Sequence, residues 1–193
     1  LVHLSIAESL IACLILAWLE AQRSLRSGIA PNEPAAQTTG LDRSIPGYFN
    51  LKMLSLAAVA GVFILILSGS YMVGYGAGSS CATWPLCRGD IWPNSPAYSI
   101  HMLHRSLAAM IGILLVWLAY KAWSHGDQVP GIRVWSAIML ALTSLQIVIG
   151  AITVWSMFSP MMKSIHLGLA TLVWMTLVYI TALIYAKPMH HKT

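Results

Sequence analysis

Residues 165–186 read IHLGLATLVWMTLVYITALIYA and contain no Asp, Glu, Lys or Arg. A membrane-spanning helix needs about 20 consecutive apolar residues, so this stretch alone predicts a transmembrane helix. Four further stretches of similar character precede it, at residues 1–19, 51–75, 99–123 and 132–157. We therefore expect five transmembrane helices joined by shorter polar segments.

The overall composition excludes an ordinary water-soluble domain. Of the 193 residues, 58% are hydrophobic and only 9% are charged, whereas soluble domains carry roughly 25% charged residues. The mean hydropathy is +0.72. The predicted fold class is all-α integral membrane, a four-helix transmembrane bundle plus one preceding transmembrane helix. The expected divisions are a helix at 1–22, a cytoplasmic linker at 23–50, the bundle at 51–187 and a cytoplasmic tail at 188–193.

Basic residues are distributed unevenly between the two sides of the predicted membrane. Successive spans reverse direction, so the connections after the second and fourth spans share one side. That side carries Arg88, Arg105 and Lys163, and the other carries Arg23, Arg26, Arg43, Lys52, Lys121, Arg133, Lys187 and Lys192. Because Lys and Arg are enriched in short cytoplasmic connections, the Cys-containing loop at 76–98 is expected on the non-cytoplasmic side. The alternative is an accidental bias. The net charge of +5 then reflects orientation in the membrane rather than nucleic-acid binding.

A short pattern recurs at the starts of three spans that run in the same direction. Residues 3–7 (HLSIA), 104–108 (HRSLA) and 166–170 (HLGLA) all read H-x-x-[IL]-A. The second and fourth spans echo each other more weakly, as Leu65, Gly69 and Val73 against Gln146, Gly150 and Val154. Self-similarity of this kind indicates repeated structural units, so we expect the three histidines at matching depth.

Ionisable side chains within a span are costly and are read first as functional residues that face the bundle interior. His104 and His166 begin parallel helices of the last four spans, so a four-helix bundle could direct both imidazoles at one buried centre. Two neutral imidazoles in hydrocarbon suit a planar, largely apolar metal macrocycle. The sequence therefore predicts a haem with His104 and His166 as axial ligands. The plainer interpretation is a histidine satisfied by a backbone carbonyl, and for His3, which has no partner in this chain, the two interpretations stand equal.

Three neighbouring residues bear on this site. His101 lies one helical turn before His104 and could compete as a ligand, although it falls outside the repeat and nearer the aqueous rim. Arg105 and Lys163 each stand close to a motif histidine, where they could pair with haem carboxylates. Ordinary snorkelling of both cations to the interface explains them equally well.

Two cysteines, Cys81 and Cys87, lie in the loop GAGSSCATWPLC at residues 76–87. The outer compartment is oxidising, so a disulfide is the default expectation, with a free or redox-cycling thiol pair as the alternative. A zinc site is disfavoured because the spacing is not C-x-x-C and no second ligand pair lies in the loop. Cys13 is expected to be an inert buried thiol. Glu8, the one acid within a span, is either buried and functional or paired with a helix beyond this chain.

Taken together, the loop at 76–87, HMLHR at 101–105, QIVIG at 146–150 and SIHL at 164–167 resemble the haem A synthase family over essentially the whole chain. That family has eight spans in two pseudo-symmetric four-helix halves. The resemblance implies that the first span closes the N-terminal half and that the bundle is the C-terminal half. Since the chain starts at an apolar leucine rather than Met, it is expected to be the C-terminal portion of a longer protein.

The same resemblance implies site residues and an activity. His104 and His166 would be the axial pair of a haem b, Cys81 with Cys87 the outer-loop disulfide, and His3 one ligand of the substrate haem in the N-terminal half. The activity implied is oxidation of the C8 methyl of haem O to the formyl of haem A for cytochrome oxidase assembly. The implied location is a bacterial cell membrane or the mitochondrial inner membrane.

The family's catalytic motif is only partly matched. Its Glu-x-x-His-Arg has His101 at the position of the glutamate in this chain, so no catalytic residue is assigned and the catalytic carboxylate is expected in the N-terminal half. The expected partners are that half, membrane lipid, an unidentified electron donor, and haem O synthase or cytochrome oxidase assembly. Nucleic acid is not an expected partner.

Two other functions fit parts of the pattern. A stand-alone membrane b-type cytochrome would explain His104 and His166 but leaves His3 without a role. A copper-binding assembly or transport protein would favour Met and Cys ligands close to the histidines. Only Met161 and Met162 come near a motif histidine in the sequence.

Overall fold

The computed structural model describes residues 2–29, 47–89, 95–127 and 129–186. This part of the chain is helical and contains no strand. The long helices are α1 (Val2–Ile29), α2 (Tyr48–Gly74), α3 (Pro96–Ser124), α4 (Ile132–Trp155) and α5 (Pro160–Tyr185), with a short 3-10 turn, η2 (Gly78–Ser80), between α2 and α3. Each of the five long helices is long and apolar enough to cross a membrane. The predicted all-α membrane fold is therefore confirmed.

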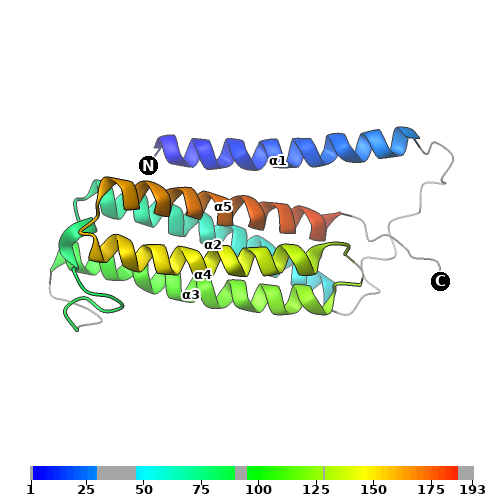
Figure 1. Cartoon of the computed structure of the whole chain (residues 1–193). Coiled ribbons are helices and arrows are strands. Elements are labelled where there is room, and N and C mark those ends of the chain that lie inside the picture. Colours follow the sequence, from blue (N-terminus) through cyan, green and yellow to red (C-terminus); the bar gives the residue numbers. More distant parts are fainter. Residues whose placement is uncertain (1, 30–46, 90–94, 128, 187–193) are drawn as a thin grey trace.

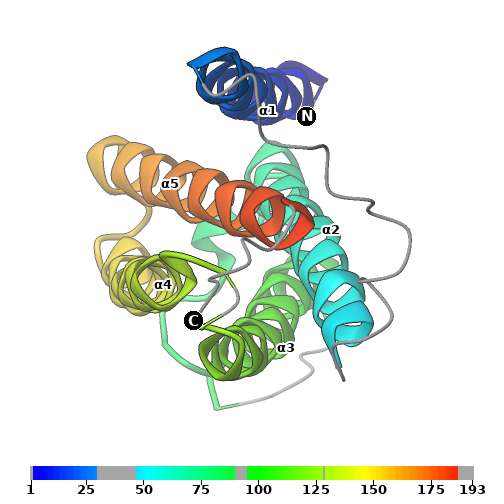
Figure 2. The same cartoon turned by 90° about the vertical axis from the view of Figure 1, so that its right-hand side faces the viewer.

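Helices α2 to α5 form a closed bundle, and α1 lies outside it (Figures 1 and 2). Both α3 and α5 pack against α2 and against α4, so α3 and α5 occupy diagonal corners. The connections α2–α3 and α4–α5 lie at one end of the bundle, and the α3–α4 connection lies at the other (Figure 1). The two histidine-bearing helices thus run in the same direction, as the alternation of spans predicts.

The helix boundaries follow local sequence signals. Pro96 and Pro160 occupy the first turns of α3 and α5, where a missing backbone N–H costs nothing. Gly47 and Gly131 precede α2 and α4 with φ of 81° and 80°, a left-handed conformation that glycine adopts without a steric penalty. α1 continues to Ile29, beyond the apolar stretch, because no proline or glycine interrupts it before Gly28. Most of the expected linker (residues 30–46 of 23–50) and all of the expected tail (188–193) lie outside the described residues.

The main apolar core fills the bundle from its α3–α4 end to about its middle. Its largest fully buried side chains include Leu118, Ile132, Met139, Leu177 and Ile180. A separate small cluster at the opposite end combines the two loop cysteines with Met102 and Tyr98. Between the core and this cluster lies a layer of polar and small residues, which contains Ser68, Gly69, His104, Gln146, Gly150 and His166.

Helix α1 docks on α5 through a buried carboxylate. Glu8 is 1% exposed, and the hydroxyl of Thr171 donates a hydrogen bond to its Oε1 at 2.7 Å. The indole N–H of Trp174 donates to the backbone carbonyl of Glu8 at 3.1 Å. At the far end of the contact, Arg23 donates to the backbone carbonyl of Ala182 at 3.3 Å. Oε1 and the backbone carbonyl of Glu8 thus find partners on α5, while Oε2 is buried without a hydrogen-bond partner among the described residues.

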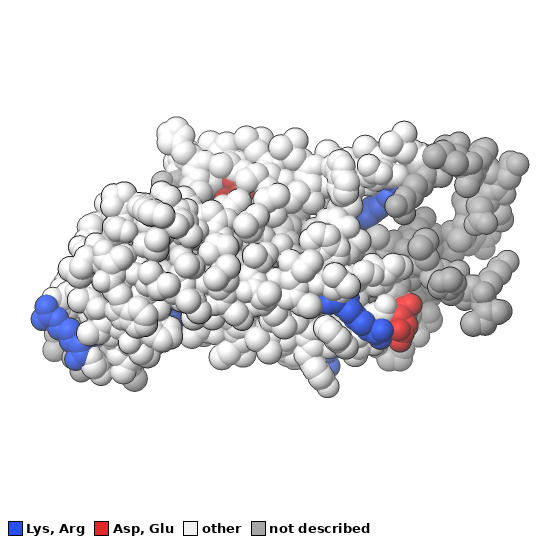
Figure 3. Space-filling model, in the orientation of Figure 1, with Lys and Arg blue, Asp and Glu red and all other residues white. Residues whose placement is uncertain are grey.

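The surface agrees with a membrane location. Figure 3 shows Lys and Arg gathered toward the two ends of the molecule, with an almost uncharged band between them. Large apolar side chains on the bundle surface and on α1 are exposed, among them Ile113, Val134 and Leu14. In a soluble protein such a surface would aggregate, whereas in a bilayer it faces lipid. The chain is an integral membrane protein.

Candidate functional site

His104 is held by two residues of the neighbouring helix α2. Its Nδ1 lies 2.8 Å from the hydroxyl of Ser68, and that hydroxyl donates its proton to the backbone carbonyl of Leu65 at 2.7 Å. A serine hydroxyl has one proton, so toward His104 it acts as the acceptor. Nδ1 of His104 therefore carries the ring proton, and Nε2 presents the lone pair. A Cβ built on Gly69 would lie only 3.0 Å from Cε1 of His104, so the ring occupies space that glycine alone leaves open.

His166 occupies the equivalent position in the second helix pair. A Cβ built on Gly150 of α4 would lie 3.1 Å from Cε1 of His166, which repeats the contact between Gly69 and His104. The polar partner differs, because the side-chain amide nitrogen of Gln146 lies 3.3 Å from Nε2 of His166. In the described part of the chain, Nδ1 of His166 and Oε1 of Gln146 are buried without a hydrogen-bond partner.

The two histidines belong to one layer of the bundle. Each ring packs on a glycine of the preceding helix, and both glycines, Gly69 and Gly150, lie five residues before the last residue of their helix, Gly74 and Trp155. His104 and His166 come from diagonal helices, so their side chains enter the same interior from opposite corners. The predicted convergence of the two motif histidines on one level of the bundle agrees with this arrangement.

His101, the competing candidate ligand, lies outside this layer in the loop-covered end of the bundle. It is 2% exposed, and its Nδ1 donates to the backbone carbonyl of Ala77 at 3.1 Å. The ring of Phe158 meets it edge-on, with centroids 5.5 Å apart. Phe158 has a φ of 59°, a costly conformation for a large side chain, and its ring also packs against Gly78. His101 therefore joins the loop after α2 to the loop after α4, in the role of a histidine satisfied by a backbone carbonyl.

Arg105 ties the cysteine loop to helix α3. One of its terminal nitrogens, Nη1, donates to the carbonyls of Thr83 at 2.8 Å and Pro85 at 2.9 Å. Both acceptors lie within the ring closed by the disulfide between Cys81 and Cys87, whose sulfurs are 2.05 Å apart. Among the described residues, the other terminal nitrogen, Nη2, is buried and has no partner. A buried, unpaired guanidinium N–H is a good donor to a carboxylate. Arg105 therefore holds the loop through Nη1 and could bind a carboxylate through Nη2.

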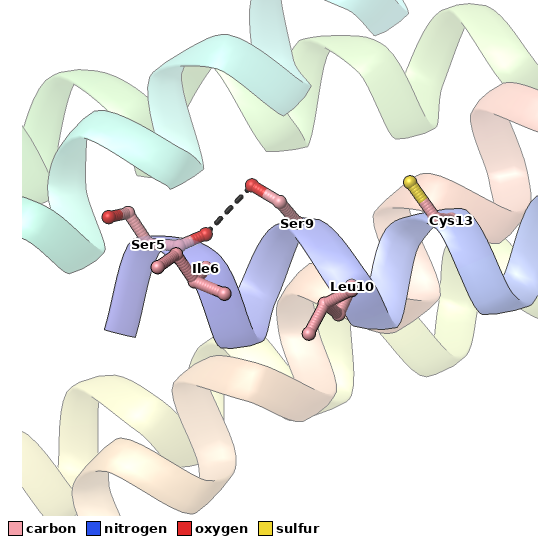
Figure 4. Close-up of a pocket in the computed structure, with 5 residues that line it drawn as sticks. All are labelled: Ser5, Ile6, Ser9, Leu10 and Cys13. Atoms are coloured by element: carbon pink, nitrogen blue, oxygen red, sulfur yellow. Dashed lines mark hydrogen bonds between the residues drawn. The ribbon is translucent and has the colours of Figure 1, made fainter. Parts of the chain in front are cut away.

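The remaining candidate residues lie apart from this layer. Lys163 is half-buried in the first turn of α5, three residues before His166. His3 is exposed on α1 and does not join His104 and His166. Cys13 was expected to be buried and is exposed on α1, because only one face of that helix meets α5. It lines a shallow open hollow with Ser5, Ile6, Ser9 and Leu10, all on α1 (Figure 4).

Sequence analysis alone did not identify the polar partners of the two histidines. Ser68 belongs to no motif, and Gln146 belongs to the weak echo between the second and fourth spans and to the QIVIG segment of the family resemblance. That echo was informative, since it paired Gly69 with Gly150. Ring packing on a glycine is the structural reason for the repeat.

The residues of the layer fit a haem. The two imidazoles could ligate an iron porphyrin, and beside the layer the open guanidinium N–H of Arg105 could pair with a porphyrin carboxylate. The described residues contain no group of three or more His, Cys, Asp or Glu side chains arranged to hold a metal ion. Both loop cysteines are consumed by the disulfide, so they offer no thiolate to copper.

Comparison with known proteins identifies the family. The chain is 29% identical over 144 residues to the protein named Heme A synthase of Alkalihalophilus pseudofirmus, covering 73% of this chain and 48% of that protein. It is 28% identical over 138 residues to the Heme A synthase of Shouchella clausii, covering 70% and 46%. It is also 31% identical over 122 residues to Protoheme IX farnesyltransferase 1 of Natronomonas pharaonis, covering 63% of this chain and 25% of that protein.

The chain thus spans about half the length of the haem A synthases it matches. The family model described as cytochrome oxidase assembly protein, COX15-CtaA, matches residues 1–178. This match includes both motif histidines, the disulfide loop and all but the last turns of α5. The chain belongs to the COX15-CtaA family of cytochrome oxidase assembly proteins.

Proposed function

We propose that this chain is the haem b-carrying portion of a haem A synthase, in which His104 and His166 are the two axial ligands. The observation that carries the proposal is the repeated contact of a histidine on a glycine, at Gly69 and at Gly150. Both contacts lie at one level of the bundle, where large apolar side chains give way to polar and small ones. Proteins named Heme A synthase resemble 73% and 70% of this chain.

Each residue has a defined task in this proposal. Ser68 keeps the ring proton of His104 on Nδ1 and so leaves Nε2 as the donor to iron. Hydrogen bonds of this kind fix the tautomer and orientation of metal-ligating histidines. Arg105, through its open Nη2, and Lys163, in the first turn of α5, would receive the haem carboxylates. When bound, the haem supplies one-electron chemistry, whose potential the surrounding protein tunes.

The complete reaction proposed is oxidation of the C8 methyl of haem O to the formyl of haem A. The chain would contribute electron transfer to it, while the catalytic carboxylate would belong to an N-terminal half. His3, exposed on α1, is proposed as one ligand of the substrate haem in that half. The disulfide loop would lie on the non-cytoplasmic side, since few basic residues accompany it.

A farnesyltransferase is the proposed working partner. Part of a curated protein named protoheme IX farnesyltransferase resembles this chain over 122 residues. Because the resemblance covers 25% of a protein with that name, it supports an association between this chain and an enzyme that farnesylates haem. Haem O passed directly between two membrane proteins would avoid free diffusion of a reactive cofactor.

An absorption spectrum of the purified protein tests the assignment of ligands. We expect a low-spin b-type spectrum that disappears in both His104→Ala and His166→Ala. His125→Ala is the matched control, because His125 follows the last turn of the same helix as His104, at the opposite end of the bundle. Pigment with an unchanged low-spin spectrum in either of the first two variants would exclude the axial pair.

A further inference from the structure

The two histidines of the layer present their lone pairs differently. On His104, Nδ1 donates to Ser68, and no hydrogen bond from the described residues reaches Nε2. On His166, the amide nitrogen of Gln146 lies against Nε2 at 3.3 Å. An amide nitrogen only donates, so Nε2 of His166 is an acceptor and its lone pair is covered. A neutral imidazole has one nitrogen with a free lone pair, so Nε2 is the ligating atom of both rings. The lone pair of Nε2 is accessible on His104 and is covered by Gln146 on His166.

This difference arises because α2 and α4 carry their polar residue at different positions relative to the glycine that packs on the histidine. On α2 the residue four before the glycine is Leu65, and the residue directly before it is Ser68. On α4 the residue four before the glycine is Gln146, and the residue directly before it is Ile149. A hydrogen-bonding side chain directly before the glycine reaches Nδ1 of the facing ring, whereas one a helical turn earlier reaches Nε2. The backbone repeat is therefore symmetric, and the polar contacts are not.

We propose that Gln146 is a positioning residue that covers the ligating nitrogen of His166 in the haem-free protein, so that His104 binds the haem iron first and His166 second. This inference rests on the proposed function, in that it assumes a haem bound by both histidines. Gln146 makes a single polar contact, since its Oε1 is buried and unpaired in the described part of the chain. One hydrogen bond is consequently all that must break before His166 can ligate.

The expected size of the effect follows from that single bond. A hydrogen bond of this type contributes a net factor of about 2 to 10 in an equilibrium or rate. Removing the amide from position 146 should therefore accelerate the second ligation step about 2- to 10-fold and leave the first step unchanged. Loss of the Ser68 hydroxyl should act on the first step only, because its partner is His104.

The test uses full-length chain produced without haem, purified in detergent and mixed rapidly with ferric protoporphyrin IX. Uptake by one histidine gives a high-spin absorption spectrum, and ligation by the second converts it to low-spin. Gln146→Leu and Gln146→Met both remove the amide, and Met keeps the unbranched shape of the side chain. Leu145→Ala is the control, because Leu145 is on the same helix and 46% exposed.

We expect wild-type protein to take up the haem quickly and to become low-spin in a slower phase. Both Gln146 variants should show the slower phase accelerated, and Leu145→Ala should match wild type. His166→Ala should take up haem and stay high-spin, whereas His104→Ala should lose the fast uptake. Wild-type kinetics in both Gln146 variants, a single phase in wild type, or the reverse behaviour of the two alanine variants would overturn the loading order. A wild-type protein that never becomes low-spin would instead refute the axial pair itself.

Discussion

Replacing Gly69 or Gly150 by alanine tests the central contact of the site. A Cβ at position 69 would lie 3.0 Å from Cε1 of His104, and one at position 150 would lie 3.1 Å from Cε1 of His166. Ordinary contacts between carbon atoms are about 3.5–4.0 Å. Each imidazole must therefore move by roughly 0.5–1 Å or the two helices must separate. Overpacking of this size costs about 1–3 kcal/mol.

The same chain supplies matched controls. Gly112 on α3 and Gly168 on α5 are also helical glycines, and a Cβ built on either meets nothing within 4 Å. Alanine at an open helical position stabilises by up to about 1 kcal/mol, because glycine is a poor helix former. Thus the same substitution should have opposite effects on stability at the two kinds of position.

Two measurements on detergent-purified protein check this prediction. The first is the melting temperature, where about 2–4 °C per kcal/mol is expected for a chain of this size. The second is the ratio of haem to protein together with the low-spin spectrum. We expect Gly69→Ala and Gly150→Ala to melt several degrees lower and to bind less haem, while Gly112→Ala and Gly168→Ala keep wild-type haem content. Full haem content with an unchanged spectrum in Gly69→Ala would show that the glycine contact does not position the ligand.

Three further substitutions examine neighbouring residues. His101→Phe should keep the low-spin spectrum yet lower the melting temperature, since the bond to a backbone carbonyl is lost but no ligand is; loss of the low-spin bands would make His101 a ligand. Arg105→Lys should loosen the disulfide loop, because an ammonium cannot reproduce the planar guanidinium, and faster hydrogen exchange at residues 81–88 would report it; unchanged exchange would refute the tether. Glu8→Leu should leave the Thr171 hydroxyl unpaired and weaken the docking of α1 by about 1–3 kcal/mol. Glu8→Gln should retain most of the docking free energy, and equal melting temperatures for these two variants would contradict the role of the hydrogen bond.

Sequence patterns were sufficient for the fold and for placing His104 and His166 at one level of the bundle, whereas their role as haem ligands stays a prediction. Apolar stretches of spanning length predicted the five helices, because the bilayer imposes both length and composition. The repeat H-x-x-[IL]-A predicted that His104 and His166 lie at one level, and both pack on glycines at one level of the bundle. These features depend on helical periodicity, which can be read from a single sequence.

The hydrogen-bond partners depended on information that periodicity does not contain. Whether Ser68 or its neighbours reach the ring of His104 is decided by the rotation of α2 about its own axis and by a side-chain rotamer. The location of Glu8 between α1 and α5 likewise depends on which face of α1 meets the bundle. Cys13 was assigned to the interior because it is mid-span, but a membrane helix can be apolar on its exposed faces as well.

The helix pairs α2–α3 and α4–α5 share the packing of a histidine on a glycine but differ in the polar residue that contacts the histidine. This combination suits a site that binds a ligand. Large apolar side chains such as Leu118 and Leu177 pack the other half of the bundle, so the frame does not depend on what occupies the histidine layer. Beside that layer, an unpaired N–H on Arg105 is costly when buried. Such a group is tolerated where a ligand satisfies it, and the layer is therefore the part of the bundle whose stability should rise most on haem binding.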